Sequence, residues 1–342
     1  MIKKTIAFLL LAFFACSLTA CGETDSKYTD EMFALDTFIS FTLYDKDEEL
    51  CKTTVDECKR EITRLEKLLS ATHTSSDVYK INLSDGDSVQ VSDETAYLIK
   101  ESLELSSVVD GSFDITVREL MSAWGFDTKE YKVPEESDIK KALLKTGYDK
   151  VSVEGNLVTL ESGVKIDLGG VAKGYITEKV SEVIKNSSVS CAVVNMGGMI
   201  ITVGEKESGE KFTLGVEHPD DNKGYFYTFE TDEVFVSTSG AYQRYFEENS
   251  VRYHHILDSK SGKPCDSEFS SVTVVGKSGE KTDMLSTAFF IMGLDKTKEY
   301  LKENEDYSVV MLSADEKTLF VSESINGSLE KEFKDDINIV YI

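Results

Sequence analysis

The first half of the chain carries apolar residues that recur every three or four positions between charged ones. The clearest case is residues 48–70, where one apolar stripe runs through an otherwise charged segment. Residues at this spacing share a face of an α-helix, so we predict an amphipathic helix with a buried stripe. The stripe consists of Cys51, Val55, Cys58, Ile62, Leu65 and Leu69. Further helices are predicted over residues 93–109, with Asp93 as the cap, 118–124 and 135–145.

From residue 151 onward the pattern changes to short runs in which apolar and polar residues alternate, which is the period of a β-strand. One such run, residues 33–43, precedes the first helix, and residues 72–82 are expected to form a polar connection. Because helices cluster early and strands later, we predict an α+β fold with helices packed on mostly antiparallel sheets, as one domain or two lobes. Later strands are predicted at 151–153, 157–160, 164–166, 191–194, 199–203, 211–217, 225–230, 233–237, 253–257, 271–275, 308–312 and 318–321, and helices at 170–185, 282–292 and 297–303.

The first twenty residues have the pattern of an export signal. Lys3 and Lys4 precede an apolar run, residues 5–15, that is too short for a permanent membrane span. The sequence Leu18-Thr-Ala-Cys21 then resembles a bacterial lipobox. We therefore expect residues 1–20 to be removed, Cys21 to carry lipid such as palmitate, residues 21–31 to form a tether and residues 32–342 to fold as a domain. The alternative is an ordinary secretory signal with an incidental cysteine.

The net charge of −25 makes nucleic-acid binding an unlikely function, because duplex binding needs a basic surface. An acidic protein that binds a pyrophosphate needs local cations or a metal to offset its own field. Zinc is not indicated, since no CxxC or histidine-rich pattern exists. Cys51 and Cys58 lie about 10.5 Å apart along a helix, beyond disulfide reach, and are expected to be core residues.

The sequence of residues 164–175 is Val-Lys-Ile-Asp-Leu-Gly-Gly-Val-Ala-Lys-Gly-Tyr, a predicted strand that runs through a glycine pair into a helix. Backbone amides at a helix N-terminus favour anions, and glycines let phosphates approach the main chain closely. Asp167 adds an acceptor and Lys173 a cation near the same point. The segment is a candidate phosphate site; by itself, a plain tight turn explains it as well.

Three other segments place polar or aromatic residues next to glycines. Residues 111–116 (GSFDIT) and 124–126 (WGF) would supply an aromatic wall and a carboxylate to a planar ligand, or simply end a helix with a buried Phe113. Residues 195–198 (NMGG) and 237–240 (STSG) each end a predicted strand in glycine, which either turns tightly or admits a ligand to the backbone.

Two further segments carry groups suited to catalysis. His254 and His255 are neighbours near a predicted strand end, and neighbours on a strand face opposite ways, so one of them is a candidate general base. Asp283 and Thr287 are four residues apart on one helical face, a pairing that suits Mg²⁺ if a backbone carbonyl joins it. The alternatives are a buried structural histidine and an ordinary aspartate near the start of a helix.

Taken in order, these motifs resemble those of the ApbE family, the FAD:protein FMN transferases. The resemblance extends from about residue 33 to residue 293, and a lipoprotein signal also fits this family. The combination of IDLGGVAKGY, HHILD and TDMLSTA is highly specific. The motifs are LDT (35–37), SDVYKIN (76–82), GSFDIT (111–116), WGF (124–126), IDLGGVAKGY (166–175), NMGG (195–198), STSG (237–240), HHILD (254–258) and TDMLSTA (282–288).

The resemblance also implies roles for individual residues. The base would be His255, directly before Ile-Leu-Asp. Leu35 stands where the family often has Met, Thr72 where it can have an aromatic residue, and Ser259 where it often has Pro. The flavin nucleotide would be held by Leu35, Thr72, Phe113, Asp114, Ile115, Asp167, Lys173 and Ile256. The metal would be held by the backbone oxygen of Gly170 and by Asp283, Ser286 and Thr287.

The resemblance implies a Mg²⁺-dependent transferase that uses FAD as its substrate. FMN would pass from FAD to a Thr or Ser hydroxyl of a target flavoprotein through a phosphoester, and AMP would leave. Anchoring through lipid would put enzyme and target on the extracytoplasmic face of a membrane. The alternatives are an FAD pyrophosphatase that yields FMN and AMP, a flavin-binding lipoprotein without activity, and a peptide- or sugar-binding surface protein.

Overall fold

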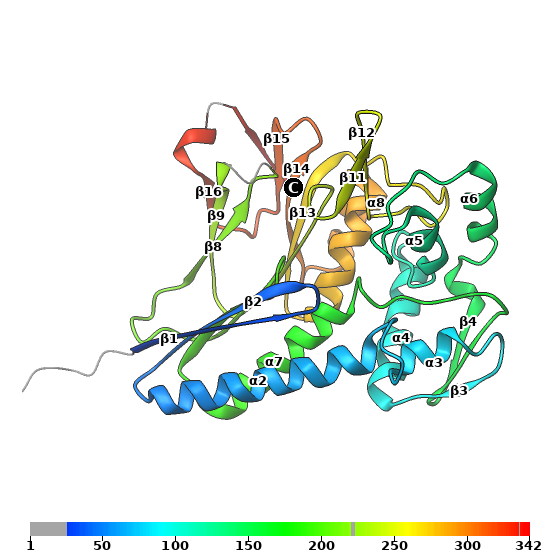
Figure 1. The fold of residues 1–342 in the computed structure, drawn as a ribbon. Helices are drawn as coiled ribbons and strands as arrows, with labels where there is room; N and C mark the ends of the chain where they lie inside the picture. Colours follow the sequence, from blue (N-terminus) through cyan, green and yellow to red (C-terminus); the bar gives the residue numbers. More distant parts are fainter. Residues whose placement is uncertain (1–25, 220–222, 335) are drawn as a thin grey trace, which may run out of the picture.

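The computed structural model describes residues 26–219, 223–334 and 336–342, so the signal and Cys21 lie outside the described residues. Its centre is a nine-stranded sheet of order β1-β2-β6-β7-β10-β13-β14-β15-β17 (Figure 1). All neighbours in this sheet are antiparallel except the pair β15 and β17. The strands are β1 (Ser26–Ala34), β2 (Thr37–Asp45), β6 (Cys191–Asn195), β7 (Met199–Gly204), β10 (Phe235–Gly240), β13 (Phe269–Gly276), β14 (Ser308–Ser313), β15 (Thr318–Val321) and β17 (Asn338–Tyr341).

Three long helices cover one face of this sheet: α2 (Glu48–Leu69), α7 (Ala172–Ser187) and α8 (Gly279–Glu303). The apolar stripe of α2 is buried as its spacing predicts, and Asp47 caps the helix by accepting from the Leu50 amide. These helices and the inward side chains of the sheet share one large apolar core. Burying each large side chain contributes about 1.5–3 kcal/mol, so this core is the main source of stability.

A three-stranded sheet packs on the opposite face of the large sheet (Figure 1). Its order is β16 (Gly327–Leu329), β9 (Tyr225–Thr231), β8 (Phe212–Glu217). Leu214 and Val216 of β8 point inward and share a second apolar cluster with Val236 and Val310 of the large sheet. The large sheet is therefore covered by helices on one face and partly by strands on the other.

The remaining elements gather beside the end of α2 and carry much of the candidate site. They include a helical group and a small sheet of order β3-β5-β4, followed later in the chain by the hairpin β11–β12. Figure 1 shows them together on the side away from β1. The elements are α3 (Asp77–Asn82), β3 (Val89–Gln90), α4 (Asp93–Val108), α5 (Arg118–Trp124), α6 (Glu136–Leu143), η1 (Tyr148–Lys150), β4 (Val151–Glu154), β5 (Leu157–Leu160), β11 (Tyr245–Glu248) and β12 (Val251–His254). The short helix η3 (Lys331–Phe333) lies elsewhere, against the sheet of β16, β9 and β8.

This architecture confirms the α+β fold with mostly antiparallel sheets. The single strand predicted over residues 33–43 is wrong, because the chain reverses at Leu35 and Asp36, which have φ angles of 55° and 58°. Residues 26–31, assigned to a tether, accordingly lie in β1. The turn lacks the Asn-Gly signal usual for such a hairpin. Instead Glu66 of α2 accepts a hydrogen bond from the Leu35 amide at 2.7 Å.

Three smaller expectations also differ from the structure. Residues 77–82 form the helix α3 rather than a loop, with Ser76 as its cap. Ser92, not Asp93, caps α4. The helix predicted from residue 282 begins at Gly279, after the cap Ser278, so Asp283 lies one turn inside it. Within the described ranges, no helix is long and apolar enough to cross a membrane.

Candidate active site

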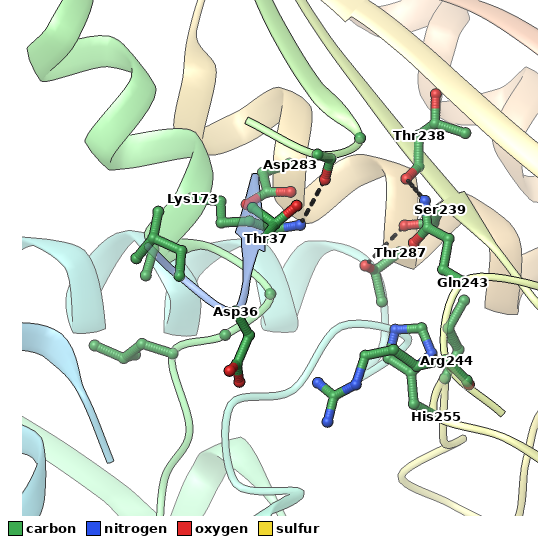
Figure 2. Close-up of a pocket in the computed structure, with 18 of the residues that line it drawn as sticks. Asp36, Thr37, Lys173, Thr238, Ser239, Gln243, Arg244, His255, Asp283 and Thr287 are labelled. Atoms are coloured by element: carbon green, nitrogen blue, oxygen red, sulfur yellow. Dashed lines mark hydrogen bonds between the residues drawn. The ribbon is translucent and has the colours of Figure 1, made fainter. Parts of the chain in front are cut away.

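A cleft of about 1300 Å³ opens where the helical group, the large sheet and the β11–β12 hairpin meet. Its walls come from segments far apart in sequence: the β1–β2 turn, the end of α2, the GSFDIT loop, the start of α7, the β6–β7 turn, the loops after β10 and β12, and one face of α8. Figure 2 shows Lys173 and Asp283 at one end of the site, His255 and Arg244 at the other, and Thr287 between them. Tertiary packing thus gathers nearly all the motifs into one cavity.

The glycine turn is held in place by side-chain and backbone bonds from two other motifs. The expected strand at 164–166 is absent, because the Asn82 side chain takes both backbone bonds of Ile166: its amide donates to the carbonyl (2.9 Å) and its oxygen accepts from the N–H (2.8 Å). The next residue, Asp167, donates its N–H to the Ile115 carbonyl at 2.7 Å. Ile115 itself is buried and does not line the cleft.

Asp167 faces the cleft but already has partners. One carboxylate oxygen accepts from Arg118 at 2.7 Å and the other from the Gly169 amide at 2.8 Å. Gly170, next in the turn, lies against Phe113: a Cβ on it would approach the Phe113 ring to 3.0 Å. Arg118 was missed by sequence reasoning, although it follows the GSFDIT motif by only two residues.

Asp114 organises the loop that carries Phe113. One of its carboxylate oxygens accepts from both the backbone N–H (2.8 Å) and the hydroxyl (2.6 Å) of Thr116. Burial raises the pKa of Asp114, and these hydrogen bonds act in the opposite direction. Asp114 and Phe113 both line the cleft, so the loop supplies an aromatic wall as well as being a tight structural unit.

The helices α7 and α8 cross in direct backbone contact at two glycines. A Cβ on Gly174 would lie 2.3 Å from the Gly279 carbonyl oxygen, and one on Gly279 would lie 2.4 Å from that of Gly174. The close approach lets the Gly174 amide donate to Asp283 at 2.9 Å. Burial raises the pKa of Asp283, and the charge of Lys173 opposes that rise. The crossing therefore sets the lysine of one motif beside the aspartate of another.

Lys173 also reaches the glycine pair that ends β6. Its ammonium group donates to the Gly197 carbonyl at 3.3 Å. Gly197 has a φ of 67°, and its amide donates to the Asn195 side chain at 2.9 Å. The segment 195–198 is thus both a tight turn and part of the cleft wall, where it receives the lysine.

Asp283 is surrounded by hydroxyl groups. Its second carboxylate oxygen accepts from Ser237 at 3.1 Å. Ser286 is buried and lies outside the cleft lining. Its hydroxyl donates to the backbone carbonyl of Asp283 at 2.8 Å and lies 2.8 Å from the Ser239 hydroxyl. Thr287 does line the cleft and lies 3.3 Å from Ser239. Sequence reasoning noted the STSG segment but not that its serines support this aspartate.

The donor set around Asp283 suits a hard cation that a phosphorylated ligand would share. The cleft offers the Asp283 carboxylate, the Thr287 hydroxyl and the backbone of Gly170, all of them oxygen donors. Within the described ranges, no cluster of three or more His, Cys, Asp or Glu residues could hold a metal by itself. Mg²⁺ is typically held by one or two carboxylates together with substrate phosphates, so these residues fit Mg²⁺ in combination with a ligand.

The two adjacent histidines face different surroundings. His254 is buried, its ring packs edge-on against Phe290, and its Nε2 lies 3.0 Å from the Cys265 carbonyl. His255 lines the cleft (Figure 2), and its Nδ1 lies 3.2 Å from the Arg244 carbonyl. Because a carbonyl oxygen only accepts, Nδ1 carries the hydrogen and Nε2 keeps a lone pair.

Burial lowers the pKa of His255 to about 3, with the charge of Arg244 as the next cause and His254 and Lys173 as smaller ones. The imidazole is therefore neutral at physiological pH, and Nε2 keeps its lone pair. Arg244 was missed by sequence reasoning. Its guanidinium group donates to the Phe126 carbonyl at 2.9 Å and lines the cleft beside His255.

The other nucleotide-directed residues lie around the same cavity. Leu35 is on the strained β1–β2 turn, Thr72 follows α2, and Ile256 follows His255. Of the thirteen non-lipid positions singled out from the sequence, eleven therefore line the cleft, and Ile115 and Ser286 lie behind it. Cys21, the fourteenth position, lies outside the described residues.

A neutral imidazole, a lysine and a carboxylate beside hydroxyl groups line this one cleft, and together such groups could act on a phosphate ester. The particular family follows from comparison with known sequences. The sequence profile of the ApbE family matches residues 35–311, and the chain belongs to this family. This confirms the family and the transferase class that the motifs predict.

Similar proteins agree with this assignment. The FAD:protein FMN transferase of Klebsiella pneumoniae (strain 342) is 31% identical over 280 residues, which cover 80% of this chain and 85% of that protein. The ApbE protein of Thermotoga maritima has a solved structure with 30% identity and a TM-score of 0.77, covering 92% of this chain and 100% of that one. The flavinyl transferase ApbE of Pseudomonas stutzeri has 26% identity and a TM-score of 0.76, covering 92% and 97%.

Proposed function

We propose that this protein is an FAD:protein FMN transferase that attaches FMN to a Thr or Ser hydroxyl of a target flavoprotein and releases AMP. The family assignment and the names of its relatives support the class of reaction. The observation that carries the proposal is the orientation of His255. Its Nδ1 hydrogen is held by the Arg244 carbonyl, which leaves Nε2 as a proton acceptor in the cleft that holds Lys173 and Asp283.

In this reaction the acceptor hydroxyl oxygen attacks the phosphorus of the FMN half of FAD. A new P–O bond joins FMN to the acceptor as a phosphoester, and the bond from that phosphorus to the bridging oxygen breaks. AMP leaves with the bonding electrons, and the hydroxyl proton passes to Nε2 of His255. General-base assistance of this kind contributes about 10²- to 10⁴-fold. Positioning and electrostatic stabilisation carry most of the remaining rate enhancement in phosphoryl transfer.

Different residues of the cleft would bind the flavin ring and the phosphates of FAD. Phe113, Ile256 and Leu35 offer apolar surface to the flavin nucleotide, and Thr72 lies at the exposed rim. The start of α7 would act on the pyrophosphate through the helix dipole, because the amides of Val171 and Ala172 already bond to the Leu168 carbonyl and that of Gly174 to Asp283. Lys173 adds positive charge there, which this acidic chain needs in order to bind a dianionic substrate.

The cation that these oxygen donors fit is Mg²⁺, which would be held by the Asp283 carboxylate, the Thr287 hydroxyl and the Gly170 carbonyl. When bound it supplies charge neutralisation to the pyrophosphate. Ser237 and the Gly174 amide keep the Asp283 carboxylate oriented through hydrogen bonds of 3.1 and 2.9 Å. Ser286 supports the same turn of α8 from behind by its bond to the Asp283 carbonyl.

We also propose that the enzyme acts as a lipoprotein on the extracytoplasmic face of a membrane. The signal pattern of residues 1–20 and the lipobox cysteine, Cys21, support this location. Two lipid signals are generally needed for stable anchoring, and each buried CH₂ contributes about 0.8 kcal/mol. The target flavoprotein would then also be extracytoplasmic.

The test is incubation of the purified protein with FAD, Mg²⁺ and extracytoplasmic flavoproteins, followed by intact-mass analysis of the acceptor and measurement of AMP. The expected result is an acceptor that gains the mass of FMN in step with AMP release. Release of FMN and AMP into solution, with no change in any acceptor, would instead identify a pyrophosphatase. His255→Ala serves as the matched control, because FAD still binds while the mass gain is lost.

A further inference from the structure

One arm of the cleft extends away from the flavin-directed residues, along the strand β8. Successive side chains on a strand point to opposite faces, and in β8 Leu214 and Val216 are buried whereas Thr213 and Glu217 are exposed. A cavity that touches residues of both faces runs along the edge of the strand. Five consecutive residues of β8 line the cleft: Thr213, Leu214, Gly215, Val216 and Glu217.

This edge of β8 is open. The strand is the last in its sheet, of order β16-β9-β8, and in the described part of the chain it pairs with β9 alone. No described loop or side chain bonds to the backbone of residues 213–217 from the other side. The row of N–H and C=O groups on an edge strand is a template on which another extended chain can pair.

The floor of this arm is a part of the large sheet that the small sheet leaves uncovered. Ser40, Val193 and Ile200 are partly exposed and line the cleft. Their chain neighbours Phe41 and Val194 point into the core on the helix side, so the three side chains point to the other face. The floor continues over β10 through Val236 and Thr238, which line the cleft on the same face. The Thr238 carbonyl accepts from Gln243 at 2.8 Å, next to Arg244 and the loop that leads to His255 (Figure 2).

The residues expected to bind FAD, among them Phe113, Asp167 and Ile256, come from other segments of the cleft wall, which leaves the edge of β8 for a second substrate. We propose that the acceptor polypeptide binds here in an extended conformation, adds a strand to the edge of β8 and presents its hydroxyl to His255. The proposal rests on the proposed function, which requires a polypeptide acceptor. Main-chain pairing would provide affinity, as in other complexes formed by strand addition.

Tyr225 gives this arm a further contact surface. Its side chain is 54% exposed, lines the cleft and lies over Gly215, where a Cβ would come within 2.5 Å of the ring. An exposed aromatic ring over a strand edge offers apolar contact to an added chain. The exposed carboxylate of Glu217 selects against acidic side chains at the neighbouring position of the acceptor.

The experiment uses the acceptor found in the intact-mass assay and a synthetic peptide that spans its modified residue. Hydrogen exchange of the wild-type enzyme is measured with and without this peptide. Slower exchange of amides in residues 213–217 is expected, because pairing protects edge N–H groups. Unchanged exchange in β8, with the peptide at saturation, would overturn the proposal.

Kinetics of two variants provide the second measurement. Thr213→Trp fills the arm and Tyr225→Ala removes its aromatic surface; each should raise the KM for the peptide by about tenfold or more while FAD affinity is unchanged. Glu230→Trp is the matched control, since Glu230 is exposed directly opposite Thr213 on β9 but outside the cleft. A KM that is equal in all variants would overturn the proposal. A wild-type enzyme that modifies no polypeptide would refute the proposed function itself.

Discussion

The amide N–H of Gly174 in α7 donates to the Asp283 carboxylate in α8 over 2.9 Å. This bond exists because two glycines let the helix backbones touch: a Cβ on Gly174 would lie 2.3 Å from the Gly279 carbonyl oxygen. The contact brings the lysine-bearing motif and the aspartate-bearing motif into one site. Of the glycines in the IDLGGVAKGY segment, Gly174 therefore constrains the site most, because it packs against α8.

Gly174→Ala should separate the two helices and displace Asp283. Overpacking of this kind typically costs about 1–3 kcal/mol of stability. We expect a lower melting temperature and, in the fraction that remains folded, a higher Mg²⁺ concentration for half-maximal AMP release. Glu182→Ala, at an exposed position of the same helix, is the control. Wild-type values of both quantities in Gly174→Ala would show that the crossing does not set the site.

His255→Ala and His254→Ala should have different effects. Loss of the His255 base should slow FMN transfer by about 10²- to 10⁴-fold while FAD affinity holds. His254 packs in the core against Phe290 and bonds to the Cys265 carbonyl, so its loss should lower the free energy of unfolding by about 1–3 kcal/mol and change the rate little. Initial rates and denaturant unfolding measure the two quantities. The larger rate loss in His254→Ala would reverse the assignment.

The pH profile should report the surroundings of His255. Burial and the charges of Arg244 and Lys173 lower its pKa from 6.5 to about 3, so the base stays unprotonated as the pH falls through 6.5. We expect kcat/KM to show no loss attributable to this imidazole until roughly pH 4. A protonation step near 6.5 that disappears in His255→Ala would contradict this environment.

Arg244→Met removes one of the charges that lower the pKa of His255. Protonation of the base should therefore move to higher pH, whereas Arg244→Lys keeps the charge and should retain the wild-type profile. The backbone carbonyl that holds Nδ1 is present in both variants, so the tautomer is preserved. Profiles of kcat/KM at saturating Mg²⁺ test this. An equal shift in both variants would assign the effect to packing rather than to charge.

Asn82→Ala should release the segment that carries Asp167. The Asn82 side chain makes both backbone bonds of Ile166, and its removal leaves two polar groups of that segment without their partner. A loss of about 1–3 kcal/mol in unfolding free energy and weaker FAD binding are expected. Asn186→Ala, on an exposed part of α7, is the control. Normal FAD affinity in Asn82→Ala would mean that the turn keeps its conformation without the two hydrogen bonds from Asn82.

Elements whose signal is local could be predicted from the residues of the chain alone. The apolar stripe of α2 and the short helix α5 follow from the 3.6-residue period, which needs only neighbouring residues to be read. The order of the motifs was enough to identify the family. It also singled out eleven residues that line one cleft, because each motif carries its own combination of residue types.

Contacts between distant parts of the chain could not be predicted in this way, because they depend on how the elements pack. The hairpin turn at Leu35 depends on Glu66, the extended segment at Ile166 takes its backbone bonds from Asn82, and Arg118 pairs with Asp167; these partners lie 31, 84 and 49 residues apart. Such contacts are set by the packing of helices on the sheet, and no periodicity encodes them. The same packing turns His255 toward the cleft and His254 toward the core. The local sequence cannot distinguish the two positions, because both residues are histidines and they are neighbours.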